Sequence, residues 1–416
     1  MSSRDSGWSV ACTEPITGRS SVTLLISESF QRYLAEAGWT EEAVVAAAIK
    51  FEALAEGISL TKEGALLLDS LERRGAATER LRTRSGVSGG LDLYLGHDIY
   101  LNAPMAEKYA LSSKVVMDAR DGQLVLSVGE YACSVAPVDR PSYYGLLDSR
   151  GRAAENIAQM CSADRLCYSL TGPTCSFWRE EERCKYCSIG QNSEADSPQR
   201  VVEELLEVMA LAVEDDARPA RHLLLGGGTP MGDDMGAKRC LRIIDAIRSS
   251  PHSLMAKIPI YVMIAAPLQD HWIDDLFQAG ADELGINLEF WSEESWPAYI
   301  PGKARRIGRD RYLEALSHAG RVFGPIRSRS ILVAGLEPLT DTLSAARELS
   351  VRGVMPIISP FRPLNGTLLA QRRGATGYDY QQVFVEAEES ARQFGLPVGP
   401  TCSPCMNNVL ALPGRR

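Results

Sequence analysis

Residues 175–187 read CSFWREEERCKYC and contain three cysteines, Cys175, Cys184 and Cys187, in the spacing C-x8-C-x2-C. The residues between them are mainly charged or aromatic, a composition that favours a loop over a packed helix or strand. A structural zinc site uses four closed ligands, whereas three thiolates on one loop can bind three irons of a cubane cluster and leave the fourth iron open. The loop therefore predicts an iron–sulfur cluster with a free coordination position.

The loop resembles the cluster-binding loop of radical S-adenosylmethionine (SAM) enzymes, in which the open iron chelates the amino and carboxylate groups of SAM. The usual spacing in that family is C-x3-C-x2-C, so the long first gap departs from it, while the final C-x2-C and the aromatic Tyr186 match. The long gap and the trailing Ile189-Gly190 are similar to biotin-synthase-like radical SAM proteins encoded beside nitrilases in bacterial gene clusters. The alternatives are a zinc knuckle or ordinary buried cysteines.

The composition of the 416-residue chain, with 45% hydrophobic and 23% charged residues, is ordinary for a folded globular protein. A formal net charge of −9 and the lack of a Lys/Arg cluster argue against nucleic acid as a partner. No apolar run is long enough for a membrane span, and residues 1–5 lack an export signal, so we expect a cytoplasmic protein without membrane contacts. Ten cysteines then indicate metal or redox chemistry rather than disulfides.

The C-terminal two thirds of the sequence alternates strand-like and helical patterns, which predicts parallel strands joined by crossover helices. Six such units predict an α/β fold, a partial (β/α)6 TIM-type barrel over residues 151–397. The strands are expected at 165–170, 222–225, 258–265, 283–290, 328–334 and 355–359.

Residues 1–150 read as an N-terminal α+β module. Thr40 is a plausible N-cap of a helix, and Asp121-Gly122 is a strong turn signal between two strand-like runs. Residues 398–416 are expected to form a C-terminal tail that carries cysteines. This division gives three parts, with the barrel in the middle.

The active-site residues of parallel β/α barrels lie on the loops at the C-terminal ends of the strands. Gly226 and Gly227 end the second expected strand, and glycines there let a ligand approach the backbone closely. They resemble the Gly-Gly-Glu motif of radical SAM enzymes, which holds the SAM amino group. Because Gly228 and Thr229 follow in place of the acid, only the backbone part of that role carries over. A bare turn is the alternative.

Four further residues are candidate SAM contacts. Glu289 ends the fourth expected strand, where a carboxylate can accept hydrogen bonds from ribose hydroxyls, and the family often holds the SAM ribose from this strand. Lys303 belongs to a basic turn suited to a carboxylate of SAM or substrate. Gly335 partly matches the family's adenine-supporting pattern, and Ile358 lies in a segment similar to the sixth strand of biotin synthases, on which adenine packs. Solvated side chains are the alternative for Glu289 and Lys303.

A second group of cysteines suggests a second cluster. Cys402 and Cys405 lie in the tail in the spacing C-x2-C, and we expect the tail to return to the active-site end of the barrel. Cys167 lies in the first expected strand, where alternate residues point into the barrel. We hypothesise that Cys402, Cys405 and Cys167, helped by Cys161, bind an auxiliary iron–sulfur cluster. The alternative is a small zinc site or a reduced thiol pair.

The resemblance implies an enzyme in which a reduced [4Fe–4S] cluster donates an electron to SAM, and the resulting 5′-deoxyadenosyl radical takes a hydrogen atom from a small-molecule metabolite. It also implies a reductant such as flavodoxin or ferredoxin. An auxiliary cluster favours sulfur insertion, that is, C–S bond formation, over dehydrogenation, rearrangement or C–C cleavage with that cluster as electron acceptor. The alternative of another class is a non-catalytic zinc or iron–sulfur scaffold or sensor.

Overall fold

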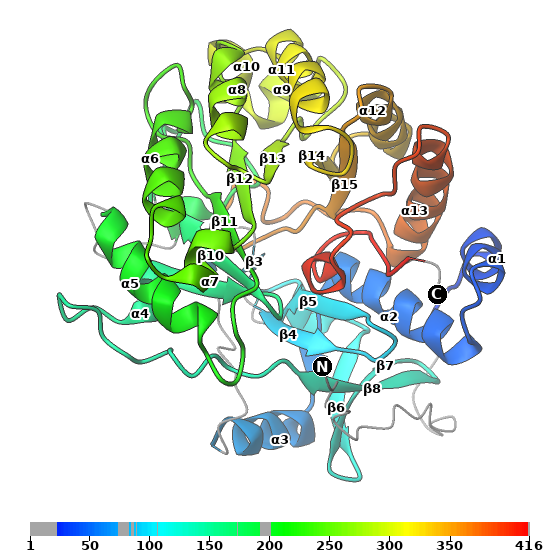
Figure 1. Ribbon diagram of the computed structural model, residues 1–416. Helices are drawn as coiled ribbons and strands as arrows, with labels where there is room; N and C mark the ends of the chain where they lie inside the picture. Colours follow the sequence, from blue (N-terminus) through cyan, green and yellow to red (C-terminus); the bar gives the residue numbers. More distant parts are fainter. Residues whose placement is uncertain are drawn as a thin grey trace.

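The computed structural model describes residues 23–73, 83–84, 87–88, 90–105, 107–172, 174–191 and 201–414. A seven-stranded sheet in the order β15-β14-β13-β12-β11-β10-β9 forms its larger part (Figure 1). The strands are β9 (Ala158–Cys161), β10 (Arg165–Ser169), β11 (His222–Gly226), β12 (Ile260–Ile264), β13 (Glu283–Ile286), β14 (Ser328–Ala334) and β15 (Met355–Pro360).

Strands β10 to β15 are paired in parallel, and β9 adds an antiparallel edge to β10. Parallel neighbours need crossover connections, which the chain supplies mainly as helices. The sheet is curled, and the mixed α/β architecture is consistent with the expected partial TIM-type barrel (Figure 1). The helices from β10 onward are α5 (Val202–Val213), α6 (Ala237–Arg248), α7 (Ser253–Lys257), α8 (His271–Gln278), α9 (Ser295–Tyr299), α10 (Pro301–Arg306), α11 (Arg309–Phe323), α12 (Leu339–Val351) and α13 (Gly377–Arg392).

A second sheet, in the order β1-β6-β7-β8-β4-β5, belongs to the N-terminal part of the chain. Its strands are β1 (Ser59–Leu60), β4 (Gly90–Tyr94), β5 (Tyr100–Pro104), β6 (Val116–Arg120), β7 (Gln123–Val128) and β8 (Tyr131–Pro137), and a separate pair is formed by β2 (Thr83–Arg84) and β3 (Val87–Ser88). The remaining elements are α1 (Glu28–Glu36), α2 (Glu41–Glu56), α3 (Lys62–Arg73), α4 (Ala154–Ile157) and the 3-10 turns η1 (Ala110–Ser112), η2 (Ile189–Gln191) and η3 (Ser403–Met406).

Two local sequence signals in this part are confirmed. The Thr40 side chain accepts a hydrogen bond from the backbone N–H of Ala43 at 3.3 Å and caps α2. Asp121 and Gly122 connect β6 and β7, and both have positive φ, as a tight hairpin turn requires. Among the described residues, no helix combines the length and the apolar character that crossing a bilayer requires.

The N-terminal part packs against the barrel through α2, which lies beside α13 (Figure 1). The ring of Phe384 in α13 packs edge-to-face against the rings of Phe30 and Phe51. Its centroid lies 6.1 Å from that of Phe30 and 5.5 Å from that of Phe51. All three side chains belong to the same buried core as the barrel strands. The two parts therefore share one hydrophobic core.

The C-terminal segment is held between the two sheets. The fully buried Lys50 of α2 donates hydrogen bonds to the carbonyls of Met406 and Ala411, at 2.8 and 2.7 Å. The backbone N–H of Asn102 in β5 donates to the Asn407 carbonyl at 2.7 Å. Because these bonds tie the segment to the N-terminal part, the position of η3 is fixed.

We predict that Lys50→Met lowers the free energy of unfolding by about 1–3 kcal/mol, because it leaves buried carbonyl groups without a donor. Burial lowers the pKa of Lys50 to about 7, and the neutral amine still has N–H donors for both carbonyls. Denaturant unfolding measures the change. The control is Lys62→Met, at an exposed position of α3, which should change stability by less than about 0.5 kcal/mol. Equal stability of the two variants would contradict the prediction.

Candidate functional site

A cavity of about 420 Å³ runs along the inner face of the seven-stranded sheet. Cys175, Cys184 and Cys187 line one part of it, beside the loop that follows β11. Arg165, at the start of β10, and Cys405 line another part. The volume lies within the range of small-molecule pockets, about 300–1,000 Å³. The cavity thus connects the three-cysteine loop with the N-terminal ends of the strands.

The three-cysteine loop, residues 174–188, is anchored by backbone hydrogen bonds to segments that follow other strands. Such bonds hold the loop in one conformation without using its side chains. They are Ser176 N–H to Thr229 O (2.8 Å), Lys185 N–H to Tyr299 O (2.9 Å), Gly302 N–H to Glu182 O (3.0 Å) and Leu368 N–H to Lys185 O (3.1 Å). The three thiols therefore lie on a rigid support.

Aromatic side chains of the loop are packed rather than solvated. Phe177 is buried, and the Arg306 guanidinium lies 5.2 Å from its ring centroid. A Cβ atom at Gly190 would lie 2.2 Å from the Trp178 ring, so only glycine fits there. The glycine of the Ile189-Gly190 pair after the last cysteine is therefore required because a larger residue would collide with Trp178.

The three thiols have an environment that suits metal binding. Burial raises the pKa of the Cys184 and Cys187 thiols, so their ionised forms need a nearby cation such as iron. The Thr229 backbone N–H points to the Cys175 sulfur at 3.4 Å. The loop has no fourth cysteine. These residues therefore fit a cubane cluster that keeps one iron open for another ligand.

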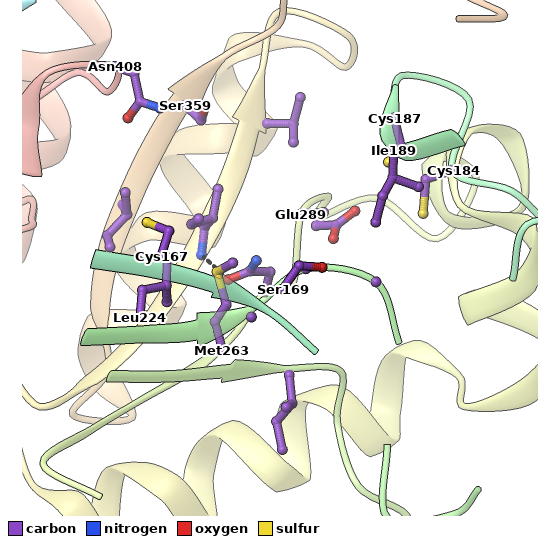
Figure 2. A pocket seen from close by; sticks show the side chains of 18 of the residues that line it. Cys167, Ser169, Cys184, Cys187, Ile189, Leu224, Met263, Glu289, Ser359 and Asn408 are labelled. Carbon is purple, nitrogen blue, oxygen red and sulfur yellow. Dashed lines mark hydrogen bonds between the residues drawn. The ribbon is translucent and has the colours of Figure 1, made fainter. Parts of the chain in front are cut away.

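Glu289 is buried beside this loop and pairs with two of the expected site residues. Its carboxylate accepts hydrogen bonds from the Tyr186 hydroxyl and the Lys303 ammonium. Burial alone would lower the pKa of Lys303, but Glu289, Tyr312 and Cys184 together raise it well above the usual value. Figure 2 shows Glu289 between the strands and the loop that carries Cys184 and Cys187. The structure thus brings Tyr186, Glu289 and Lys303 into one charged network.

An extra residue in the sheet places the Glu289 side chain. Gly285 pairs with Arg329, and Glu289 forms a bridge with Leu332. The paired residues are 44 positions apart in the sequence in the first case and 43 in the second. The β13 side therefore contains one extra residue, which bulges out after Ile286. We expected a regular strand over 283–290, but β13 ends at Ile286. Bulges re-aim side chains next to functional sites. Glu289 itself has a φ of 68°, which is unusual for a residue other than glycine.

The glycines after β11 are required by close packing on the end of β10 and on the three-cysteine loop. A Cβ atom on Gly227 would lie 2.5 Å from the Ser169 Oγ. A Cβ atom on Gly228 would lie 1.9 Å from the Thr174 carbonyl oxygen. Gly227 also has a φ of +102°, which disfavours other residues. Gly226 and Gly227 line the cavity, so their backbone is available to a bound ligand.

Two expected cofactor contacts do not line the cavity. Gly335 has a φ of +98°, and a Cβ atom there would lie 2.7 Å from the Tyr380 hydroxyl, so it is needed for packing on α13. Ile358 is fully buried, and its neighbours Ile357 and Ser359 line the cavity instead. Successive strand residues point to opposite faces. The β15 side chains on the cavity side are therefore those of Ile357 and Ser359, and the role of Ile358 in cofactor binding stays a prediction.

The C-terminal cysteines lie at the N-terminal ends of the strands, not at the active-site end where we expected them. Cys405 Sγ is 3.0 Å from Nε2 of His222, the first residue of β11. The Cys402 thiol donates a hydrogen bond to Cys405, and Arg165 and His222 lie close, so the pKa of Cys405 falls well below its usual value. The position of η3 follows from the contacts with Lys50 described above.

Cys167 interacts with Cys161 rather than with this pair. Burial and the contact with Cys161 raise the pKa of the Cys167 thiol. Figure 2 shows Cys167 on its strand, away from the loop that carries Cys184 and Cys187. Sequence reasoning missed His222 and Asp164 beside the C-terminal cysteines. The available signal was their position, since His222 is the first residue of β11 and Asp164 directly precedes β10, which carries Cys167.

The central part of the chain is similar to a known superfamily. The model of the Radical SAM superfamily matches residues 181–346, which are less than half of the chain. The match includes Cys184, Cys187, Glu289 and Lys303 and begins after Cys175. A bacteriochlorophyllide c C-7(1)-hydroxylase of Chlorobaculum limnaeum is 29% identical over 89 residues, which are 21% of this chain and 22% of the hydroxylase.

Several solved structures are also similar to this chain. Methylornithine synthase (PylB) aligns with a TM-score of 0.42 and 14% identity, over 54% of this chain and 63% of that protein. SuiB of Streptococcus suis aligns with a TM-score of 0.39 and 11% identity, over 57% and 48% of the two chains. TsrM of Kitasatospora setae is a radical S-adenosylmethionine methyltransferase whose structure has cobalamin and a [4Fe–4S] cluster bound. It aligns with a TM-score of 0.35 and 14% identity, over 45% of this chain and 36% of that protein. The chain spans less than two thirds of each of these relatives.

We predict that Glu289→Gln lowers the free energy of unfolding by about 3 kcal/mol, because it leaves the largely buried Lys303 without a counter-charge. The double variant Glu289→Gln/Lys303→Met should recover part of this loss, since it removes the unpaired cation. Thermal and denaturant unfolding measure both. Glu293→Gln, at an exposed position of the same loop, is the control. Strictly additive effects of the two substitutions would show that the pair is not coupled.

Proposed function

We propose that this chain is a radical SAM enzyme that takes a hydrogen atom from a small molecule bound in the cavity. The observation that carries the proposal is the position of Cys175, Cys184 and Cys187, which lie on one anchored loop beside a cavity large enough for a small ligand. The match of residues 181–346 to the superfamily supports it. When bound, a [4Fe–4S] cluster and SAM would supply the electron and the carbon radical.

The protein's own groups bind and orient in this proposal. Glu289 can accept hydrogen bonds from ribose hydroxyls, and Lys303 can donate to a carboxylate. Because the two already form one network with Tyr186, their positions are set before a ligand arrives. The backbone of Gly226 and Gly227 lines the same cavity and is open to an amino group. These roles follow the family resemblance residue by residue.

The cavity restricts the reacting molecule to small size. Its middle part is lined by apolar side chains of several strands, with a few polar groups among them, the usual composition of a small-molecule site. Such walls exclude water from a reactive carbon. The apolar lining includes Leu224, Met263, Ile331 and Val333, and the polar lining includes Ser169, Asn287, Ser359 and Asn408. A reductant such as flavodoxin or ferredoxin stays a prediction from the resemblance.

Sulfur insertion stays a prediction for the fate of the substrate radical. It needs a sulfur-bearing auxiliary cluster, for which the sequence suggested Cys402, Cys405 and Cys167. The thiols of Cys161, Cys167 and Cys405 all line the cavity, which supports this reaction. The association of Cys405 with His222 rather than Cys167 weighs against an auxiliary cluster, and therefore equally against the alternative of dehydrogenation, rearrangement or C–C cleavage with that cluster as electron acceptor.

Counting acid-labile sulfide before and after a single turnover separates the two reaction types. Sulfur insertion from an auxiliary cluster predicts that sulfide falls by one atom for each product molecule. Dehydrogenation, rearrangement and C–C cleavage predict unchanged sulfide, because they consume no cluster sulfur. Unchanged sulfide together with a sulfur-free product would remove the sulfur-insertion assignment.

We predict that the anoxically reconstituted protein, reduced with dithionite, converts SAM to 5′-deoxyadenosine and methionine. Cys187→Ala should abolish the conversion, because one iron loses its protein ligand. Cys240→Ala, at a fully buried position of α6, is the matched control and should keep it. Chromatography of the products measures the yield. A reduced wild-type protein that forms no 5′-deoxyadenosine would favour a scaffold or sensor.

A further inference from the structure

Four side chains from three separate segments meet at the N-terminal ends of β10 and β11. They are Asp164, His222, Cys402 and Cys405, and one ligand atom from each lies within 4.8 Å of the others. The ligand atoms around a tetrahedral zinc ion, at Zn–S of about 2.3 Å and Zn–N of about 2.0 Å, are about 3.3–3.8 Å apart. The group is therefore close enough to share a single ion.

The positions of these side chains are fixed by the fold. Asp164 lies in the turn between β9 and β10, and its carbonyl accepts a hydrogen bond from Arg221 at 2.8 Å, next to His222. The Cys405 N–H donates to the Cys402 carbonyl at 3.0 Å, so the turn η3 presents both thiols on one side. Because each segment is held by its own backbone bonds, the group is preorganised for a ligand.

The group has unused ligand capacity. His222 faces Cys405 with Nε2, at 3.0 Å from the sulfur, and Asp164 with Nδ1, at 3.8 Å from the carboxylate. The Asp164 Oδ1 atom, which is the one that lies 3.8 Å from His222 Nδ1, is buried and makes no hydrogen bond. A buried carboxylate oxygen without a partner is rare, because desolvation penalises it strongly. A cation at this place would satisfy it.

The charges also fit a divalent ion. Two thiolates and one carboxylate contribute three negative charges, and the neutral imidazole of His222 contributes none. A divalent cation and the adjacent Arg165 guanidinium would together supply three positive charges. Thiolate and imidazole ligands in tetrahedral arrangement select zinc over magnesium or calcium, which prefer oxygen.

We propose that Asp164, His222, Cys402 and Cys405 bind one Zn²⁺ ion that has a structural role. Four protein ligands close the coordination sphere, which is the pattern of structural rather than catalytic zinc. The ion joins the C-terminal segment to the starts of β10 and β11 and closes the cavity at that end. This proposal is independent of the proposed function, since the ion does not touch the three-cysteine loop.

The zinc site and the auxiliary cluster expected from the sequence exclude each other, because both need Cys402 and Cys405. A cluster distributes its thiolates over different irons and therefore needs ligands that are spaced more widely than the ligands of one ion. Cys175, Cys184 and Cys187, all in the described part of the chain, form no group as tight as this one. The geometry thus distinguishes a cluster loop from a single-ion site within the same protein.

The experiment uses the full-length triple variant Cys175→Ala/Cys184→Ala/Cys187→Ala, in which the loop can no longer hold a cluster. Elemental analysis of this variant, purified from cells supplied with zinc and iron, should find one zinc ion per chain. Adding Cys402→Ser/Cys405→Ser, or separately His222→Gln, should abolish zinc binding, whereas adding Cys240→Ala should not. The proposal is overturned if the triple variant contains no zinc. It is also overturned if zinc still binds after Cys402→Ser/Cys405→Ser has been added.

A second measurement keeps all four proposed ligands, so its result does not depend on whether the ligand variants fold. Co²⁺ added to the metal-free triple variant should give the visible bands of tetrahedral cobalt and the near-ultraviolet absorption of thiolate coordination. Zn²⁺ should then displace the Co²⁺ and remove both signals. Octahedral cobalt without thiolate absorption overturns the proposal. Iron and sulfide bound at Cys402 and Cys405 in place of zinc overturn it as well and would restore the auxiliary cluster.

Discussion

The candidate site depends on holding three thiols at fixed positions on a loop that offers no fourth thiol. The three-cysteine loop meets this constraint through backbone hydrogen bonds to segments that follow other strands. Gly190 and Gly228 pack on Trp178 and Thr174 of this loop more closely than any side chain would permit. Because the restraint comes from the backbone, the thiols themselves stay available for iron.

The cavity has two chemically different parts. At one part, the network of Tyr186, Glu289 and Lys303 places opposite charges beside the three-cysteine loop. At the other part, Cys405 and Arg165 lie where the N-terminal module and the C-terminal segment meet the strands. Lys50 joins the N-terminal module to the C-terminal segment, since it donates hydrogen bonds from α2 to two carbonyls of that segment. The N-terminal module therefore helps to build one wall of the cavity.

Periodicity and turn chemistry predicted the alternation of strands and helices, the cap at Thr40 and the hairpin at Asp121-Gly122. Those features depend on neighbours in the sequence. The bulge before Glu289 and the one-residue difference at Ile358 depend on register between strands, which single-strand patterns do not determine. The meeting of His222 with Cys405 joins residues 183 positions apart. Alternation along β10, which singled out Cys167, could also have indicated Arg165 and Ser169, and both line the cavity.

The central claim is that the three-cysteine loop leaves one iron open to SAM. Mössbauer spectroscopy of protein reconstituted with ⁵⁷Fe, recorded with and without SAM, tests it most directly. We expect a [4Fe–4S] spectrum in which a single iron site changes its isomer shift when SAM is added, because only that iron gains ligands. A cluster whose irons all ignore SAM, or a loop that holds zinc in place of iron, would contradict the account.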